Sequence, residues 1–402
     1  MEKQIKFIDL DYNFSSELTD YSFSITESFV KINYKKAVKE DINYLLLHIR
    51  QPFNVKTVMD TIPNDLYLLM QQGIIKPLIF MTTEQWDLFD TYAWQTNKHK
   101  LTPDFGNVPY SVLIKNFTNR SIPEENITWV VPDNNYIKDI EFLKNRGYKI
   151  ACKFLQFDYF LEIFKTVAQK YKIEEKKFKK YYSCLCKGNP RHHRYGIIYN
   201  LWQYNLLSKG NISCGPYKEL IETKNSNWID DSIKSDTFMS NFINWNNSKD
   251  EFIKLLPLTF DNKQNSHWNI KNYNESNIFE NTFLWISSET KKVHNGIYIT
   301  EKTWKAIAYG SPFCINGDSG SLQYLKDLGF KTFEKNWDES YDNDNDIDKI
   351  KKITNIIKNI CNKSLEELNE LYVEILPILK YNQEHLKMYP QYNNLIEALK
   401  NE

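Results

Sequence analysis

Short apolar runs separated by amphipathic stretches characterise the first part of the chain. The runs at 78–81 and 129–131 are followed by polar or turn residues and predict buried strands. A helix is expected over 137–145, and a third strand at 148–152. A longer helix is expected over 155–180, because apolar side chains recur there at helical spacing. Strands that alternate with helices predict a parallel sheet.

The second part of the chain repeats this pattern with short connections. Strands are expected at 181–186, 283–287 and 312–315. A helix is expected at 301–309, and Gly310 stands directly after it, where helices commonly end. Such a series of strands and helices is typical of a doubly wound α/β domain.

The last part of the chain is expected to be helical. Isoleucines recur at helical spacing from 350 onward, and Ser364 with Glu367 forms a capping box. A chain of 402 residues is long enough for two domains. We therefore expect an N-terminal Rossmann-like domain at 1–178 and a second Rossmann-like domain at 179–363. C-terminal helices at 364–402 are expected to pack back onto the N-terminal domain.

Composition narrows the class of protein. Hydrophobic residues make up 42% of the chain and aromatic residues 15%, which excludes a mostly disordered protein. The 51 basic and 51 acidic residues give zero net charge, which does not favour nucleic acid as the main partner. The six cysteines include no C-x-x-C pair, and no apolar stretch approaches 18 residues. We therefore expect free thiols, no membrane span and a soluble intracellular protein.

Thr300, Glu301 and Lys302 begin one predicted helix and are the first candidate site. Thr300 is a suitable N-cap residue. A lysine in the first turn opposes the helix dipole unless an anion binds there. With an anion bound, the ammonium, the dipole and the free N–H groups all attract the same charge. Glu301 can accept hydrogen bonds from sugar hydroxyls. A capped surface helix with a solvated ion pair is the competing interpretation.

A second candidate site is the basic segment 189–194, in the turn between a predicted strand and a predicted helix. Ligands of open α/β sheets bind outside the carboxyl ends of the strands, so this turn is well placed. Arginine suits a diphosphate because its planar guanidinium makes two bonds at once. A solvated basic loop is the alternative. A zinc site is not favoured, because the spacing of the four candidate ligands matches no usual zinc pattern; they are Cys184, Cys186, His192 and His193.

Aspartates at 342, 344 and 346 form an acidic cluster. The cluster fails as an EF-hand loop, because Ile347 stands where the loop needs glycine. It is still a candidate Asp-x-Asp metal site for nucleotide-sugar transfer. The competing interpretation is an acidic helix start, where carboxylates are favoured by the helix dipole.

Glu84 lies just after the predicted strand at 78–81. A carboxylate at the end of a strand, facing a cleft, is suited to act as a general base. Asp87 and Asp90 are rival candidates. A solvated carboxylate at a helix start is again the alternative.

Residues 298–305 read Tyr-Ile-Thr-Glu-Lys-Thr-Trp-Lys and are followed by Gly-Ser-Pro-Phe at 310–313. This combination resembles the signature of the α-1,3-fucosyltransferases, glycosyltransferase family 10. Glu289, in the segment Ser-Glu-Thr-Lys, is similar to a glutamate that precedes the signature in that family. Thr303 and Lys305 depart from the signature and leave the donor base and the sugar open.

Two further segments strengthen the resemblance, and the four matched segments follow the family's order. Residues 184–194 and on to Gly215 are similar to the opening strand of the family's donor domain, with Arg194 at its phosphate-binding arginine. Residues 80–84 resemble the segment that carries the family's catalytic base. The stretch 329–342 is similar to glycosyltransferase-like proteins of marine phages and giant viruses.

The resemblance implies a GT-B fold, in which two Rossmann-like domains face across a cleft. It implies an inverting glycosyltransferase that needs neither metal nor cofactor. The donor would be a nucleoside-diphosphate sugar, with a GDP-sugar and fucose favoured, and the acceptor a hydroxyl of a glycan. Glu84 would be the catalytic base. The donor-binding residues would be Arg194, Glu289, Tyr298, Thr300, Glu301 and Lys302.

Other functions are compatible with the sequence. One is a transferase that acts on a base of viral DNA, which the zero net charge does not favour. Another is a catalytically silent binding or structural protein on the same fold. A third is a metal-dependent transferase that uses the acidic cluster. The expected location is the cytoplasm of a bacterium or of a virus-infected cell.

Overall fold

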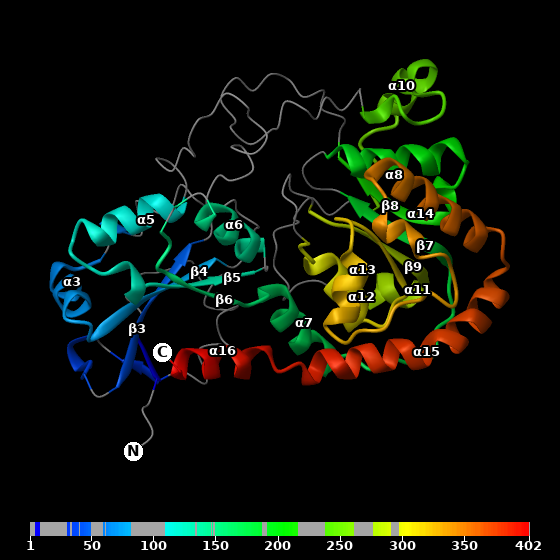
Figure 1. Cartoon of the computed structure of the whole chain (residues 1–402). Coiled ribbons are helices and arrows are strands. Elements are labelled where there is room, and N and C mark those ends of the chain that lie inside the picture. Colours follow the sequence, from blue (N-terminus) through cyan, green and yellow to red (C-terminus); the bar gives the residue numbers. More distant parts are fainter. Residues whose placement is uncertain are drawn as a thin grey trace. The chain divides into compact units, whose positions relative to one another are not determined.

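The protein is a mixed α/β protein with two parallel sheets, seen in a computed structural model (Figure 1). The chain divides into two compact units. One comprises Met1–Ile163, Lys292–Gly296 and Pro390–Glu402, and the other Phe164–Lys291 and Ile297–Tyr389. The structure describes residues 5–8, 30–32, 34–39, 41–49, 59–60, 62–81, 109–132, 135–145, 147, 149–186, 191–215, 238–260, 276–290 and 297–401.

The first unit contains a six-stranded sheet with the order β2-β1-β3-β4-β5-β6, and every neighbouring pair is parallel. The strands predicted at 78–81 and 129–131 are confirmed as parts of β4 and β5. In register, Ile79 of β4 lies opposite Trp129 of β5. The strands are β1 (Ile5–Ile8), β2 (Val30–Ile32), β3 (Ile42–Ile49), β4 (Ile75–Met81), β5 (Thr128–Val131) and β6 (Lys153–Gln156).

The strand predicted at 148–152 is wrong in position, because β6 occupies Lys153–Gln156. The helix predicted over 155–180 is correspondingly shorter and is α7, Tyr159–Lys170. The reason is that β6 lies at the edge of the sheet and is largely solvent-accessible, so its apolar signal is weak. The position of β6 is set by its parallel pairing with β5, in which Thr128 lies opposite Lys153.

Both faces of the first sheet are covered, as parallel sheets require. Ile79 and Trp129 point into the larger apolar cluster, which is completed by residues of α3, α5 and α6. Leu78 and Val130 point to the opposite face, where they pack with Leu399 and its neighbours on α16. The helical segments of this unit are η1 (Tyr34–Lys36), α3 (Asn64–Gln71), α5 (Pro109–Thr118), η3 (Glu124–Asn126), α6 (Asn135–Lys144) and α16 (Gln391–Lys400).

The second unit contains a four-stranded parallel sheet with the order β10-β9-β7-β8. The strands predicted at 181–186, 283–287 and 312–315 are confirmed, and the last of them begins at Phe313. The strands are β7 (Lys180–Cys186), β8 (Gly210–Cys214), β9 (Thr282–Ser288) and β10 (Phe313–Asn316). The helical segments are α8 (His192–Gln203), η4 (Leu207–Lys209), α10 (Trp245–Lys254), α11 (Ser276–Asn281), α12 (Glu301–Ala308), α13 (Ser321–Asp327), η6 (Ser340–Asn343), α14 (Asp346–Cys361) and α15 (Leu365–Met388).

The direction of winding reverses between β7 and β9 in this second sheet. The connection through α8 leads from β7 to β8 on one side, whereas the connection through α12 leads from β9 to β10 on the other. Right-handed crossovers then place α8 and α12 on opposite faces of the sheet. The packing agrees, because α8 contacts α14 while α12 contacts α15 (Figure 1). The carboxyl ends of β7 and β9 therefore form a topological switch point, the usual ligand site of such sheets.

Lys176 links the segment before β7 to the end of α12 and to α11 by hydrogen bonds. Its Nζ donates hydrogen bonds to the carbonyl oxygens of Tyr309 at 2.8 Å, Gly310 at 3.1 Å and Phe279 at 3.3 Å. Burial lowers the pKa of Lys176 to about 7, although the nearby Glu280 carboxylate attracts its charge. Lys176 is thus a partly buried amine whose pKa lies well below that of an ordinary lysine.

We expect Lys176 to make stability rise with pH. Between about pH 7 and its ordinary pKa near 10.5, the unfolded chain binds a proton that the folded chain does not. The free energy of unfolding should therefore increase by roughly 2 kcal/mol between pH 7 and pH 9 from this group. Urea unfolding at both pH values would measure it. Lys176→Met should reduce the pH slope and Lys177→Met should not; equal slopes in both variants would contradict the assignment.

Candidate functional site at the switch point

The candidate site is built where β7 and β9 end and where α8 and α12 begin. Arg194 lies in the first turn of α8, and Glu289 directly follows β9. The Glu289 carbonyl oxygen lies 3.0 Å from His193 Nε2 and accepts a hydrogen bond from an Arg194 guanidinium nitrogen at 3.4 Å. These contacts hold the start of α8 against the end of β9, so residues from both connections converge on one place.

Glu289 fixes the start of α12. Its side chain is fully buried. One carboxylate oxygen accepts hydrogen bonds from the Thr303 hydroxyl at 2.6 Å and the Thr303 backbone N–H at 3.3 Å. The other accepts a hydrogen bond from the Thr300 hydroxyl. Burial raises the pKa of Glu289, and the attraction of Lys302 offsets only part of that effect. Glu289 therefore holds the first turn of α12 in place through buried hydrogen bonds.

Lys302 and Glu301 form an ion pair at the surface of this site. Lys302 Nζ lies 2.7 Å from a Glu301 carboxylate oxygen and donates a second hydrogen bond to the Thr300 hydroxyl at 3.2 Å. Their side chains are 17% and 15% exposed. Burial alone would raise the pKa of Glu301, but the Lys302 and Lys305 ammonium groups outweigh it and the pKa is lowered. Glu301 is therefore ionised at neutral pH.

The charges of the site favour an anion when Glu289 carries a proton. Arg194 is 7% exposed and Lys302 contributes the second cation, while Glu301 contributes one negative charge. The formal net charge of these groups is then +1, and it falls to zero if Glu289 ionises. The two helix starts add N–H groups and positive dipole ends. Tyr298, two residues before Thr300 in the chain, is buried.

Thr303 and Cys186 also belong to this site, although from sequence Thr303 had no role and Cys186 was considered only as a zinc ligand. Thr303 is the departure from the fucosyltransferase signature, and its hydroxyl is a partner of Glu289. Cys186 ends β7 with its sulfur 3.8 Å from that of Cys184. The hydrogen bond with Cys184 lowers the pKa of Cys186 to about 7; burial opposes this, and Arg194 adds to it. The C-x-C spacing at a strand end was the available signal, since it places both thiols on one face.

The aspartates of the acidic cluster accept hydrogen bonds at a helix start or lie beside basic side chains. Asp342 accepts hydrogen bonds from two backbone N–H groups at the beginning of α13, at 2.9 and 3.1 Å. Asp344 pairs with Lys352 at 2.7 Å, and Asp346 lies 3.6 Å from His192. In the part of the chain that the structure describes, no group of three or more His, Cys, Asp or Glu side chains is placed to hold a metal.

Glu84, Asp87 and Asp90 lie outside the described residues, so the candidate general base is not part of this geometry. All six cysteines fall inside the described ranges; each is buried and none forms a disulfide. Within the same ranges, no helix is long and apolar enough to cross a membrane.

Comparison of the chain with family models, curated proteins and solved structures produced no match. The class of protein is therefore defined by its own geometry: an α/β protein with a parallel sheet whose switch point brings together a buried arginine, a lysine and two carboxyl groups.

Proposed function

We propose that this protein is an inverting, metal-independent glycosyltransferase of the GT-B type. It would move a sugar from a nucleoside-diphosphate donor to a hydroxyl acceptor, for which a glycan is favoured. The observation that carries the proposal is the position of Arg194 and Lys302. Each lies in the first turn of a helix, and the two helices diverge from the switch point between β7 and β9.

The proposed chemistry follows from these positions. A nucleoside diphosphate is the leaving group, and Arg194 and Lys302 would stabilise the charge that develops on it. Glu301 is the carboxylate within reach of sugar hydroxyls, and binding of a diphosphate would draw Lys302 away from it. Glu289 would act through Thr300 and Thr303 rather than by contact with the donor.

Parts of the proposal rest on the sequence resemblance alone. Glu84 would take the proton of the acceptor hydroxyl, and the donor would be a GDP-sugar, with fucose favoured. A cytoplasmic location also belongs to this proposal. An acceptor in nucleic acid is a less favoured variant, because the net charge of the chain is zero.

We expect nucleoside diphosphates to stabilise the protein against heat without a metal. A ligand at 100 times its dissociation constant adds about 2.7 kcal/mol to the free energy of unfolding. Melting curves with GDP, UDP, CDP and ADP, and with the corresponding nucleotide sugars, each with and without EDTA, would measure the shift. Inorganic phosphate and the matching nucleosides are the controls for charge and for base.

The pattern of melting shifts distinguishes the proposed function from its alternatives. A shift with GDP or GDP-fucose in EDTA supports the full proposal, and a shift with another base retains the transferase and removes the fucose. A shift that EDTA abolishes contradicts a metal-independent donor site. The absence of any shift would favour a catalytically silent binding protein.

A further inference from the structure

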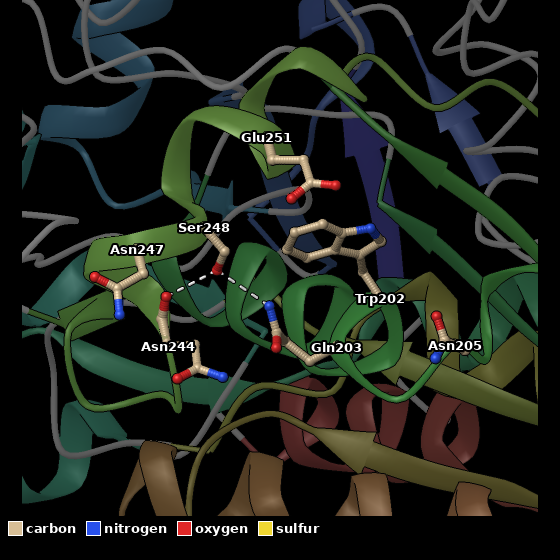
Figure 2. A pocket seen from close by; sticks show the side chains of 7 residues that line it. All are labelled: Trp202, Gln203, Asn205, Asn244, Asn247, Ser248 and Glu251. Atoms are coloured by element: carbon tan, nitrogen blue, oxygen red, sulfur yellow. Dashed lines mark hydrogen bonds between the residues drawn. The ribbon is translucent and has the colours of Figure 1, made fainter.

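A hollow lies at the end of α8 that is far from the switch point. It has a volume of about 540 Å³, within the usual range for small-molecule sites. Figure 2 shows Asn244 and Asn247 at one end of the hollow, Asn205 at the other, and Trp202 and Ser248 between them. The hollow is therefore formed by the end of α8 together with the first two turns of α10.

This hollow is separate from the proposed donor site. Trp202 stands eight residues after Arg194 on the same helix. At a rise of 1.5 Å per residue, this is about 12 Å along the helix axis. The two sites therefore lie at opposite ends of one rigid element of the second unit.

Hydrogen bonds hold the polar side of the hollow in place. The Ser248 hydroxyl lies 2.8 Å from the Tyr199 hydroxyl and accepts a hydrogen bond from Gln203 Nε2 at 3.1 Å. Ser248 also donates to the Asn244 carbonyl oxygen at 2.8 Å (Figure 2). This network joins α8 to α10, so the spacing between the two sides of the hollow is set before any ligand binds.

Aromatic packing holds the Trp202 ring. Its ring centroid lies 5.6 Å from that of Phe252 and 5.7 Å from that of Tyr199. The indole is half-buried, so part of it remains available at the hollow. An indole fixed in this way offers a flat apolar surface beside polar groups, at little cost in side-chain entropy.

The polar groups of the hollow select the class of ligand. Most small-molecule pockets are lined mainly by apolar side chains, but Trp202 is accompanied here by amides, a hydroxyl and the Glu251 carboxylate. None of the described residues that line the hollow is Lys or Arg, so a phosphate or nucleotide is disfavoured. Amides both donate and accept hydrogen bonds, and a carboxylate accepts two, as neighbouring hydroxyls require.

We propose that this hollow is a binding site for a neutral oligosaccharide. A pyranose ring has an apolar face of C–H groups, which would lie on the Trp202 indole, and equatorial hydroxyls, which would bind Asn247 and Glu251. The proposal does not require the transferase activity. If that activity is present, the site would retain a glycan about one helix length from the donor.

The test is ligand-observed NMR on the full chain without nucleotide. Saturation transfer would be measured to maltotriose, cellotriose, chitotriose, mannotriose, N-acetyllactosamine and sialyllactose. At least one neutral sugar should give a saturable signal. Asn247→Ala and Glu251→Gln should each weaken its binding about 5-fold, the effect of one lost hydrogen bond. Asn246→Ala, an exposed neighbour outside the lining, is the matched control and should bind as wild type does.

Three results would overturn the site: no saturable signal from any sugar, normal binding by both lining variants, or a preference for sialyllactose over N-acetyllactosamine. Nucleotide-dependent melting shifts, recorded on the same variants, keep this test separate from the donor site. They should equal those of the wild type, since Asn247 and Glu251 lie on α10, away from Arg194 and Lys302.

Discussion

Replacement of Arg194 by alanine should weaken binding of a nucleoside diphosphate by roughly 30- to 150-fold, or about 2–3 kcal/mol. Arg194 as a whole is only 7% exposed, so little water competes with a phosphate for its side chain. It is also held in place by the Glu289 carbonyl oxygen. Isothermal titration with the nucleoside diphosphate that gives the largest melting shift would measure the change.

Further variants distinguish the contribution of the Arg194 charge from that of its guanidinium geometry. Arg194→Lys retains the charge but loses the bidentate fork, so it should recover only part of the affinity. Lys302→Ala should weaken binding by about 10-fold, less than the arginine variant, because Lys302 is already paired with Glu301. Lys305→Ala should have a smaller effect than Lys302→Ala, because the Lys305 ammonium attracts Glu301 more weakly than does Lys302, which forms an ion pair with it. A dissociation constant unchanged in Arg194→Ala, with an unchanged melting temperature without ligand, would remove Arg194 from the site.

Local rules were sufficient to predict how several helices begin and end. The Thr300 side chain accepts a hydrogen bond from the backbone N–H of Lys302 at the start of α12, as the N-cap prediction required. Ser364 and Glu367 form the predicted capping box of α15. Gly310 has φ of +59°, a left-handed conformation that glycine adopts most readily, so glycine is favoured after α12. Each of these features depends on residues adjacent in the chain or on backbone sterics.

Features that depend on distant partners were not predictable in the same way. The position of β6 follows from its ladder with β5, and its own residues carry only a weak apolar signal. Glu289 was predicted to bind the donor, on resemblance alone. Its burial and its bonds to Thr300 and Thr303 become visible only when β9 and α12 are brought together. A sequence can indicate that a carboxylate belongs to a site without indicating whether it contacts ligand or supports the residues that do.

Glu289→Ala should destabilise the second unit by about 3 kcal/mol. The substitution leaves the Thr303 hydroxyl and N–H and the Thr300 hydroxyl without their buried acceptor, and each lost partner costs about 1 kcal/mol or more. Differential scanning calorimetry should show a fall in melting temperature of roughly 6–12 °C for a unit of this size. Nucleoside diphosphate binding should also weaken, because the start of α12 is no longer fixed.

Glu289→Gln is the matched variant, since it retains the shape and one acceptor oxygen. The folded pKa of Glu289 is raised above that of the unfolded chain, so its proton contributes stability at low pH that is lost as pH rises through the folded pKa. Glu289→Gln should remove this decrease in stability above pH 4.5. A neutral side chain also keeps the formal charge of the site at +1, so diphosphate binding should become independent of pH across the Glu289 titration. If Glu289→Ala melted at the wild-type temperature and bound nucleotide normally, Glu289 would not support the site, and the link between β9 and α12 would have to come from other contacts.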